Sequence, residues 1–276
     1  MVEELSQGRA VMRLRLESLG ANEDPAPVGR MMQERIHKDA AGAILFDATV
    51  SPQVDHDWFA PEYWREQDAL RMQAGGRGGV AIVASPAGEC VLRHYHRGGM
   101  VAALIGDRYL WTGADRTRGF AEFRLLGKIA QLGLPGPSVV AARYVRHGLY
   151  YTADLITLFI DQAPTLADCL ATGRLDSELA EEVGALVARF HRAGIWHADL
   201  NAHNVLVTTG QLYLIDFDRG QDRSRSKAPT QAWRLANLRR LRRSLLKLGA
   251  ARQGEAAFEQ TIWQPLLYRY GRTLDA

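Results

Sequence analysis

Cysteine and long apolar runs are scarce in this 276-residue chain, and each scarcity excludes a class of protein. Two cysteines, Cys90 and Cys169, are too few for a disulfide framework, which favours a reducing compartment. No run approaches the roughly 18 consecutive apolar residues that a membrane-spanning helix requires, and the first residues lack the apolar core of a secretory signal. We therefore expect a protein that neither crosses a membrane nor carries a cleaved signal.

Negative charge is scarce in one part of the chain. Residues 219–252 contain eleven Lys or Arg and one acid, Asp222, so this segment carries +10 and the remainder −7, although the whole chain carries +3. This asymmetry predicts a negatively charged partner near the basic segment. Otherwise the composition, 47% hydrophobic and 24% charged, is that of an ordinary globular protein with one large domain or two lobes.

An ordered set of polar residues is present between positions 195 and 220. The sequence His197-Ala198-Asp199-Leu200 is followed by Asn204, then by two short apolar segments separated by a turn, and then by Asp216-Phe217-Asp218. Kinases of the eukaryotic type hold a catalytic Asp, a metal-binding Asn and a second metal-binding Asp in this strand-turn-strand setting. The pattern therefore predicts a phosphoryl-transfer site.

The three polar residues suit phosphoryl transfer, which needs positioning and charge stabilisation more than covalent help. Asp199 would orient the attacking hydroxyl or accept its proton. Asn204 and Asp216 would offer two oxygen ligands to a hard cation such as Mg²⁺. Each residue alone is more often part of a polar loop or of a hairpin rim. Their order, with apolar strands where the motif requires them, favours a kinase.

Lysine is absent between residues 39 and 127, where a kinase keeps the lysine that binds the α- and β-phosphates of ATP. In the second strand of a predicted hairpin, Arg93 occupies the corresponding position, and a guanidinium can also pair with phosphate. Glu122, in the first turns of a helix expected over 118–132, is its expected partner. The alternatives are a surface arginine on a strand and a solvated helix carboxylate.

A glycine-rich turn precedes this hairpin and contains Gly76 and Gly78. Its backbone N–H groups could approach phosphates closely, so we expect it to bind ATP. The turn departs from the glycine-rich consensus of kinases, and such turns are common. Asp55-His56-Asp57 could be a metal cluster, but a helix cap from Asp57 or a neighbour near Pro61 explains it better.

Together with the kinase-type motif, the order of the predicted strands and helices indicates an α+β, bilobal protein-kinase-like fold. Its N-lobe is a small antiparallel sheet and its C-lobe is shortened and mainly helical. Residues 1–40 are expected to be a disordered leader, 41–160 the nucleotide-binding N-lobe and 161–276 the catalytic and acceptor-binding C-lobe. A first strand is expected at 43–46. The segment 230–248 is expected to be a basic amphipathic helix, which could lie on a membrane surface or have a solvated basic face.

With these residues assembled, the chain resembles the bacterial 3-deoxy-D-manno-octulosonic acid (Kdo) kinases of lipopolysaccharide assembly. The resemblance rests on Leu92-Arg93-His94-Tyr95 with Arg97-Gly98-Gly99, Asp107-Arg108-Tyr109-Leu110-Trp111-Thr112-Gly113, Glu122-Phe123-Arg124-Leu125-Leu126, the loop from His197 to Asn204, and Asp216-Phe217-Asp218-Arg219-Gly220. It implies ATP-dependent phosphorylation of a Kdo hydroxyl on a Kdo-lipid A precursor. It also implies a peripheral protein on the anionic cytoplasmic face of the bacterial inner membrane, with no nucleic acid as partner.

Two other interpretations stay open at this point: a kinase of the same shape that acts on heptose or protein, and a catalytically silent kinase-like binding module. Ala198 stands where a protein kinase has the arginine that grips its phosphorylated activation loop, and no Ala-Pro-Glu follows Asp216. Only 58 residues follow Asp218, too few for a full protein-kinase C-lobe. The missing lysine favours the silent module, whereas Asp199 and Asn204 together with Asp216 oppose it.

Overall fold

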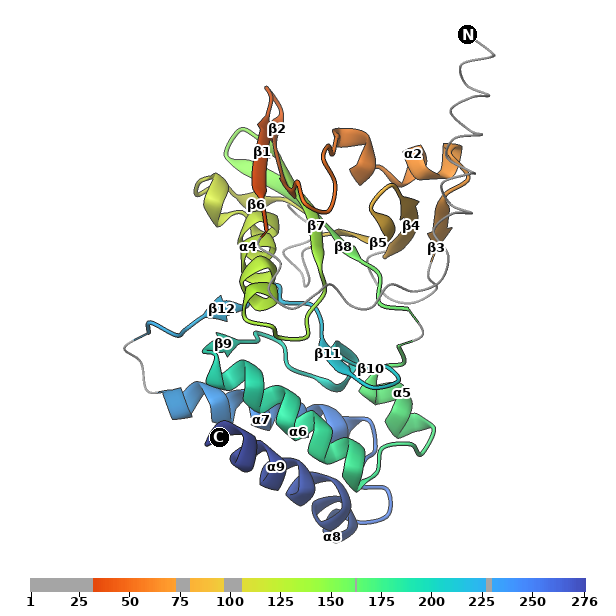
Figure 1. Cartoon of the computed structure of the whole chain (residues 1–276), viewed down its shortest axis with the longest axis vertical. Helices are drawn as coiled ribbons and strands as arrows, with labels where there is room; N and C mark the ends of the chain where they lie inside the picture. Colours follow the sequence, from red (N-terminus) through yellow and green to blue (C-terminus); the bar gives the residue numbers. More distant parts are fainter. Residues whose placement is uncertain (1–31, 73–79, 97–105, 162, 227–229) are drawn as a thin grey trace.

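The computed structural model describes residues 32–72, 80–96, 106–161, 163–226 and 230–276. Within these ranges the chain forms a part that contains a sheet and a part that is mainly helical, one above the other in Figure 1. The sheet comes from the first half of the chain and most of the helices from the second. The predicted α+β fold with two lobes is confirmed.

In the described ranges, an antiparallel sheet of eight strands forms the upper part of the molecule in Figure 1, which we call the upper lobe. Seven strands follow the order β1-β2-β7-β8-β5-β4-β3, and β6 pairs with β8. Strand β5, which carries Arg93, therefore lies beside the long β7–β8 hairpin at the centre of the sheet. The bounds are β1 Glu34–Lys38, β2 Gly42–Asp47, β3 Leu70–Met72, β4 Ala81–Ser85, β5 Gly88–His94, β6 Tyr109–Leu110, β7 Val139–His147 and β8 Tyr150–Leu158.

The two faces of this sheet contact different helices, and β2 shows this most clearly. Its alternate residues Ala43 and Leu45 belong to the core beneath α4 (Arg118–Gln131), whereas Ile44 and Phe46 belong to a second core under η1 (His56–Phe59) and α2 (Pro61–Glu66). Successive strand residues point to opposite faces, so a strand that is covered on both faces is apolar throughout. Helix α4 thus lies on the face that turns toward the lower lobe.

The lower lobe is built around helices α6 (Ser177–Arg192) and α9 (Gln264–Leu274). A Cβ atom added at Gly184 of α6 would lie 2.1 Å from the carbonyl oxygen of Leu266, so this close packing requires glycine. The other elements are α5 Leu166–Ala171, η3 Ala202–Asn204, α7 Thr230–Lys247, α8 Glu255–Phe258, the π-helical turn η4 Glu259–Trp263, and the short strands β9 Ile195–Trp196, β10 Val205–Val207, β11 Leu212–Leu214 and β12 Gln221–Asp222, with η2 Ala114–Arg116 in the upper lobe. No helix in the described ranges is both long and apolar enough to span a membrane.

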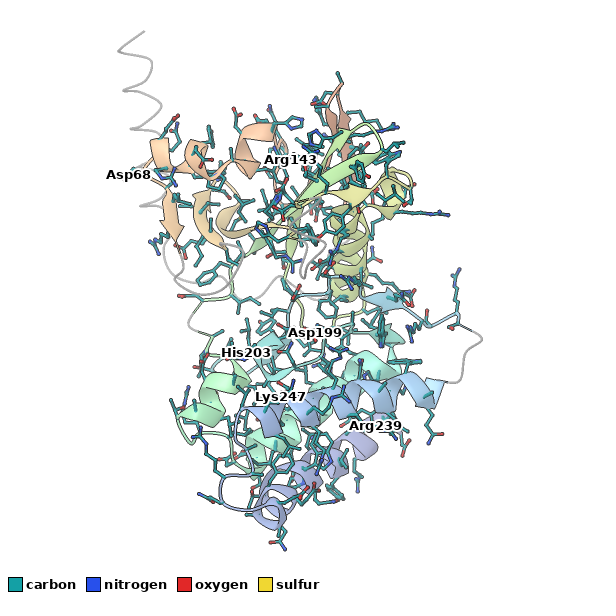
Figure 2. The ribbon with its side chains drawn as sticks, turned by 180° about the vertical axis from the view of Figure 1, so that it is seen from behind. Asp68, Arg143, Asp199, His203, Arg239 and Lys247 are labelled. Carbon is teal, nitrogen blue, oxygen red and sulfur yellow. The ribbon has the colours of Figure 1, made fainter. Side chains whose placement is uncertain are left out.

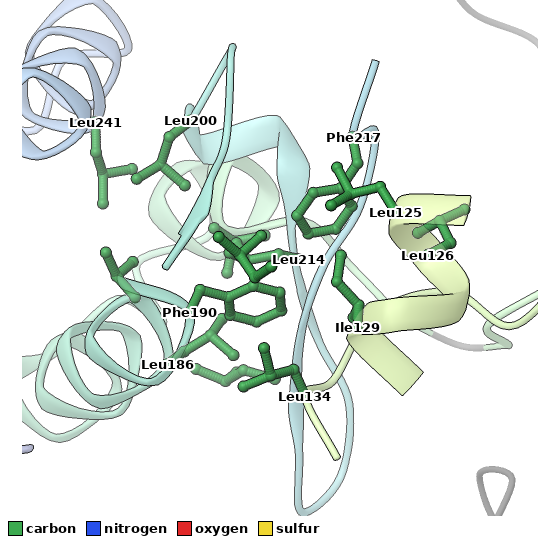
Figure 3. Close-up of a cluster of buried hydrophobic side chains, with 14 of the residues drawn as sticks. Leu125, Leu126, Ile129, Leu134, Leu186, Phe190, Leu200, Leu214, Phe217 and Leu241 are labelled. Atoms are coloured by element: carbon green, nitrogen blue, oxygen red, sulfur yellow. The ribbon is translucent and has the colours of Figure 1, made fainter. Parts of the chain in front are cut away.

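Phe217 joins the two lobes through their shared core. Figure 3 shows its ring near Leu125 and Ile129 of α4 and near Phe190 of α6. The rings of Phe217 and Phe190 stack with centroids 5.5 Å apart, and Phe217 is 1% exposed. Burial of one such side chain contributes about 2–3 kcal/mol. The two aspartates that flank Phe217 are therefore held at a defined position between the lobes.

The prediction that residues 1–40 form a disordered leader is wrong for the last residues of this segment. Residues 34–38 form β1, which pairs with the whole of β2 in antiparallel register. Every residue of β1 is exposed, so its sequence lacks the apolar alternation that predicts a strand. The segment 43–46, which was expected to be the first strand, therefore belongs to the second strand, β2. Residues 1–31 lie outside the described ranges.

The expected helix cap from Asp57 or a neighbour is also wrong. Helix α2 begins after Ala60 without a side-chain cap, and Asp57 lies inside η1. Pro61 at the first position of α2 has no N–H that would need a partner, which makes a cap less necessary. The neighbouring His56 contacts Asp39, with Nε2 and Oδ2 2.5 Å apart.

Candidate active site

The predicted catalytic loop follows β9 and is fixed by a buried histidine. His197 is 3% exposed, with Nε2 2.9 Å from the carbonyl oxygen of Ile215. Its Nδ1 accepts a hydrogen bond of 3.1 Å from the N–H of Asp199. Burial lowers the pKa of His197, so the ring is neutral and donates through Nε2. The histidine thus ties Asp199 to the residue that precedes Asp216.

Asp199 presents its carboxylate at the surface, with a side chain that is 57% exposed. Its Oδ2 accepts from Asn201 Nδ2 at 3.1 Å and its Oδ1 from Arg240 Nη1 at 2.7 Å. The buried Asn204 donates from Nδ2 to the backbone oxygen of Asp199 at 3.0 Å, which leaves Asn204 Oδ1 as the atom that could bind a cation. The loop therefore combines an oriented carboxylate with a fixed amide.

Asp216 lies beside Asn204 because the β10–β11 hairpin returns the chain to the loop. The N–H of Ile215 donates to the carbonyl oxygen of Asn204 at 3.0 Å. Asp216 has φ 62°, a left-handed conformation that few residues other than glycine adopt and that is frequent at functional sites. Its Oδ1 accepts a hydrogen bond from Arg93 Nη1. Asn204 and Asp216, the two predicted metal ligands, thus lie together with Arg93, the arginine predicted to bind phosphate.

Arg93 is held by two groups of the upper lobe in addition to Asp216. Its Nη2 lies 2.5 Å from Glu122 Oε2 and 3.3 Å from the hydroxyl oxygen of Tyr95. The Tyr95 hydroxyl in turn donates to Glu122 Oε2 at 2.6 Å. Burial opposes the charge of Arg93, but Glu122, Tyr95 and Asp216 together outweigh burial and raise the pKa of Arg93 well above its ordinary value. The predicted Arg93–Glu122 contact is present, and Tyr95 is a partner that sequence analysis missed.

A second arginine of the upper lobe binds the other aspartate of the Asp-Phe-Asp segment. Arg118, the first residue of α4, donates from Nε to Asp218 Oδ1 at 2.7 Å, and its Nη2 pairs with Asp218 Oδ2. Its Nη1 donates to the Tyr109 hydroxyl at 2.6 Å. Asp218 lies in the predicted motif, but nothing in the sequence links it to a residue 100 positions away.

Helix α7 of the lower lobe also holds the catalytic loop. Sequence analysis did not predict these contacts. Asn237 Nδ2 donates to the carbonyl oxygen of His197 at 2.7 Å, and Ser244 Oγ accepts from the N–H of Ala202 at 3.1 Å. Arg240 lies between them on the same helix face and contacts Asp199. Figure 2 shows Asp199 above this helix, on which Arg239 and Lys247 are labelled. The basic helix is therefore part of the site.

The comparison with known proteins agrees with this geometry. The model of the lipopolysaccharide kinase (Kdo/WaaP) family matches residues 61–270, which is most of the chain. The chain belongs to this family. The 3-deoxy-D-manno-octulosonic acid kinase of Stenotrophomonas maltophilia (strain R551-3) is 49% identical over 216 residues, which cover 78% of this chain and 84% of that protein.

Further similarities extend over most of the chain. The protein of the same name from Xylella fastidiosa (strain M23) is 45% identical over 218 residues, which cover 79% of this chain and 85% of the relative. The solved structure of WaaP in complex with acyl carrier protein is 18% identical and aligns over 74% of this chain and 78% of the other, with a TM-score of 0.47.

Membership of the lipopolysaccharide kinase (Kdo/WaaP) family makes the chain a phosphotransferase that acts on a hydroxyl group and uses ATP. The predicted resemblance to Kdo kinases is confirmed at the level of the family. Gly76 and Gly78, predicted to bind the nucleotide, lie in the segment 73–79, which is outside the described residues. Asn204 and Asp216 supply an amide and a carboxylate, and these oxygen donors fit a hard cation such as Mg²⁺.

Proposed function

We propose that the protein transfers the γ-phosphate of ATP to a hydroxyl of Kdo on a lipid A precursor, with Mg²⁺ as the cation. One observation supports this most: hydrogen bonds, one of them through the backbone of Ile215, bring Asp199, Asn204, Asp216 and Arg93 together in a member of the lipopolysaccharide kinase family, although Arg93 and Asp216 are 123 positions apart. The names of the 45–49% identical relatives support Kdo as the acceptor.

In this proposal Asp199 acts on the acceptor. It orients the Kdo hydroxyl and takes its proton as the hydroxyl oxygen bonds to the γ-phosphorus and the bond from that phosphorus to the bridging oxygen breaks, which releases ADP. Asn201 and the buried Asn204 hold the loop so that the exposed carboxylate keeps its direction. Asn204 and Asp216 would hold the cation, which when bound neutralises charge on the transferred phosphate.

Arg93 is proposed to bind the phosphates of the nucleotide. Glu122 and Tyr95 already fix its guanidinium, so little side-chain entropy remains to be lost on binding. The guanidinium can bind phosphate oxygens in bidentate fashion, as a lysine cannot. The hydrogen bond between Arg93 and Asp216 supports this role, because a phosphate-binding arginine and a metal-binding carboxylate must lie close together if both act on the same phosphate chain.

The exposed basic residues of α7 support a location at the cytoplasmic face of the inner membrane. Leu241 and Leu245 are fully buried, so the apolar face of the helix packs inside the protein and does not enter lipid. Arg239, Arg243 and Lys247 remain exposed and could contact anionic head groups. The interaction that we propose with the membrane is therefore electrostatic.

The direct test is transfer of radioactive phosphate from ATP to a purified Kdo-lipid A precursor in the presence of Mg²⁺. The lipid should be labelled, and lipid A without Kdo should not be. Labelling that requires heptose on the acceptor, or that occurs on a protein in preference to the glycolipid, would contradict the proposal.

A further inference from the structure

The contact between Arg240 and Asp199 has no role in phosphoryl transfer as described above. Arg240 Nη1 lies 2.7 Å from Asp199 Oδ1. The guanidinium therefore lies beside the carboxylate at which the acceptor hydroxyl is proposed to bind. An anionic group of the same acceptor could share this guanidinium with Asp199.

Arg240 is placed so that it can receive such an anion. Asn237 and Ser244, on the same face of α7, anchor the helix to the catalytic loop and so fix the position of the Arg240 backbone. The Arg240 side chain is 46% exposed, and Asp199 is the one acid that it contacts among the residues the structure describes. A guanidinium has five N–H donors in one plane, so several stay available beside Asp199.

The acceptor in the proposed function supplies an anion at the right place. Kdo is a sugar acid, so a single ring carries both the hydroxyl groups and a carboxylate, a few ångströms from each other. A hydroxyl bound to Asp199 brings that carboxylate within reach of a guanidinium that itself contacts Asp199. Arginine pairs with carboxylates through two parallel hydrogen bonds, which fixes orientation as well as affinity.

We propose that Arg240 binds the carboxylate of the acceptor sugar, and thereby positions the hydroxyl on Asp199 and selects acidic sugars over neutral ones. The inference rests on the proposed function for the identity of the acceptor. It also distinguishes Arg240 from Arg239 and Arg243 of the same helix, which are exposed and do not contact Asp199 in the described structure.

The test compares two acceptors that have no lipid: the methyl glycoside of Kdo and its C1 primary amide, which has nearly the same shape without the charge. Wild type should bind the acid about ten- to hundredfold more tightly than the amide, the usual value of a hydrogen bond between charged groups. Arg240→Gln should bind both alike, and Arg240→Lys should keep part of the preference. Arg269→Gln, which changes an exposed arginine of α9, is the matched control and should behave as wild type.

Steady-state kinetics provide a second readout. In Arg240→Gln the KM for the acid should rise about ten- to hundredfold, while the KM for ATP stays near wild type. Equal binding of acid and amide by wild type, or an undiminished preference for the acid in Arg240→Gln, would overturn the inference. Phosphate transfer to the Kdo glycoside by wild type tests the proposed function separately, because the binding preference is measured without turnover.

Discussion

The Arg93 guanidinium and the Glu122 carboxylate lie 2.5 Å apart, and this contact joins strand β5 to helix α4. Glu122 is 4% exposed, so its charge is stabilised by Arg93 and the Tyr95 hydroxyl and hardly by water. The same guanidinium reaches Asp216 at the boundary between the lobes. An arginine thus occupies the place that a lysine has in other kinases.

Replacement of Arg93 should impair the use of ATP. Arg93→Met removes a charged hydrogen-bond donor and leaves Glu122 buried without its cation, so we expect the KM for ATP to rise about tenfold or more. Arg93→Lys should retain part of the activity, and Glu122→Gln should have a smaller effect because Glu122 only orients Arg93. Initial rates over an ATP series measure this. Full activity in both Arg93 variants would show that another cation binds the phosphates.

Asn204 and Asp216 should act through the divalent cation. Asn204→Ala removes one oxygen ligand and Asp216→Asn removes the negative charge of the other, so the Mg²⁺ concentration for half-maximal activity should rise about tenfold or more in each. A Mg²⁺ titration at saturating ATP shows this. Asp199→Asn is the control, since its Mg²⁺ requirement should stay at the wild-type value. An unchanged requirement in Asp216→Asn would remove it from the metal site.

The free energy of unfolding should fall as the pH is lowered from 6.5, because of His191. This residue is 2% exposed, and burial lowers its pKa to about 3. An unfolded chain protonates histidine near pH 6.5, so below that pH the unfolded state binds the additional proton. His191 therefore does not reduce the free energy of unfolding above about pH 6.5. Between about pH 6.5 and 3 it lowers that free energy by up to about 1.4 kcal/mol per pH unit.

Denaturant unfolding at a series of pH values from 7.5 to 5 tests this. His191→Gln should be less stable at pH 7.5, because the contacts of His191 with Tyr270 and Asn237 change, but its stability should fall less steeply with acid. Parallel pH profiles for the two proteins would mean that His191 does not titrate as its burial requires.

The exposed basic face of α7 should govern binding to anionic membranes. Each Lys or Arg near such a surface contributes about 1 kcal/mol, screened over about 10 Å at moderate salt. Reversal of Arg239, Arg243 and Lys247 to Glu should therefore reduce cosedimentation with anionic liposomes and leave the KM for ATP unchanged. Arg269→Glu with Arg272→Glu, on α9, is the control. Binding that does not depend on salt, or that is equal in all three proteins, would contradict a membrane role for this face.

The centre of the site could be predicted from the sequence because its residues are close along the chain. Asp199, Asn204 and Asp216 stand at fixed spacings around two apolar strands, and local hydrogen bonds set their geometry. Arg93 was predicted because no lysine was available, and Glu122 because it lies early in the next helix.

The partners that hold this centre could not be predicted. The period of α7 shows which face is apolar, but it does not show that Asn237, Arg240 and Ser244 meet the catalytic loop. The Arg118–Asp218 pair likewise depends on the way the lobes pack. Strand β1 was missed since a fully exposed edge strand carries no apolar pattern.

The central claim is that Asp199 acts on a hydroxyl of Kdo, and mass spectrometry of the product tests it most directly. A Kdo-lipid A precursor incubated with ATP and Mg²⁺ should gain one phosphate, located on the Kdo sugar by fragmentation. Asp199→Asn should form this product about 10²–10⁴ times more slowly while binding ATP as wild type does. A phosphate on the glucosamine backbone, or near-normal turnover by Asp199→Asn, would contradict the account.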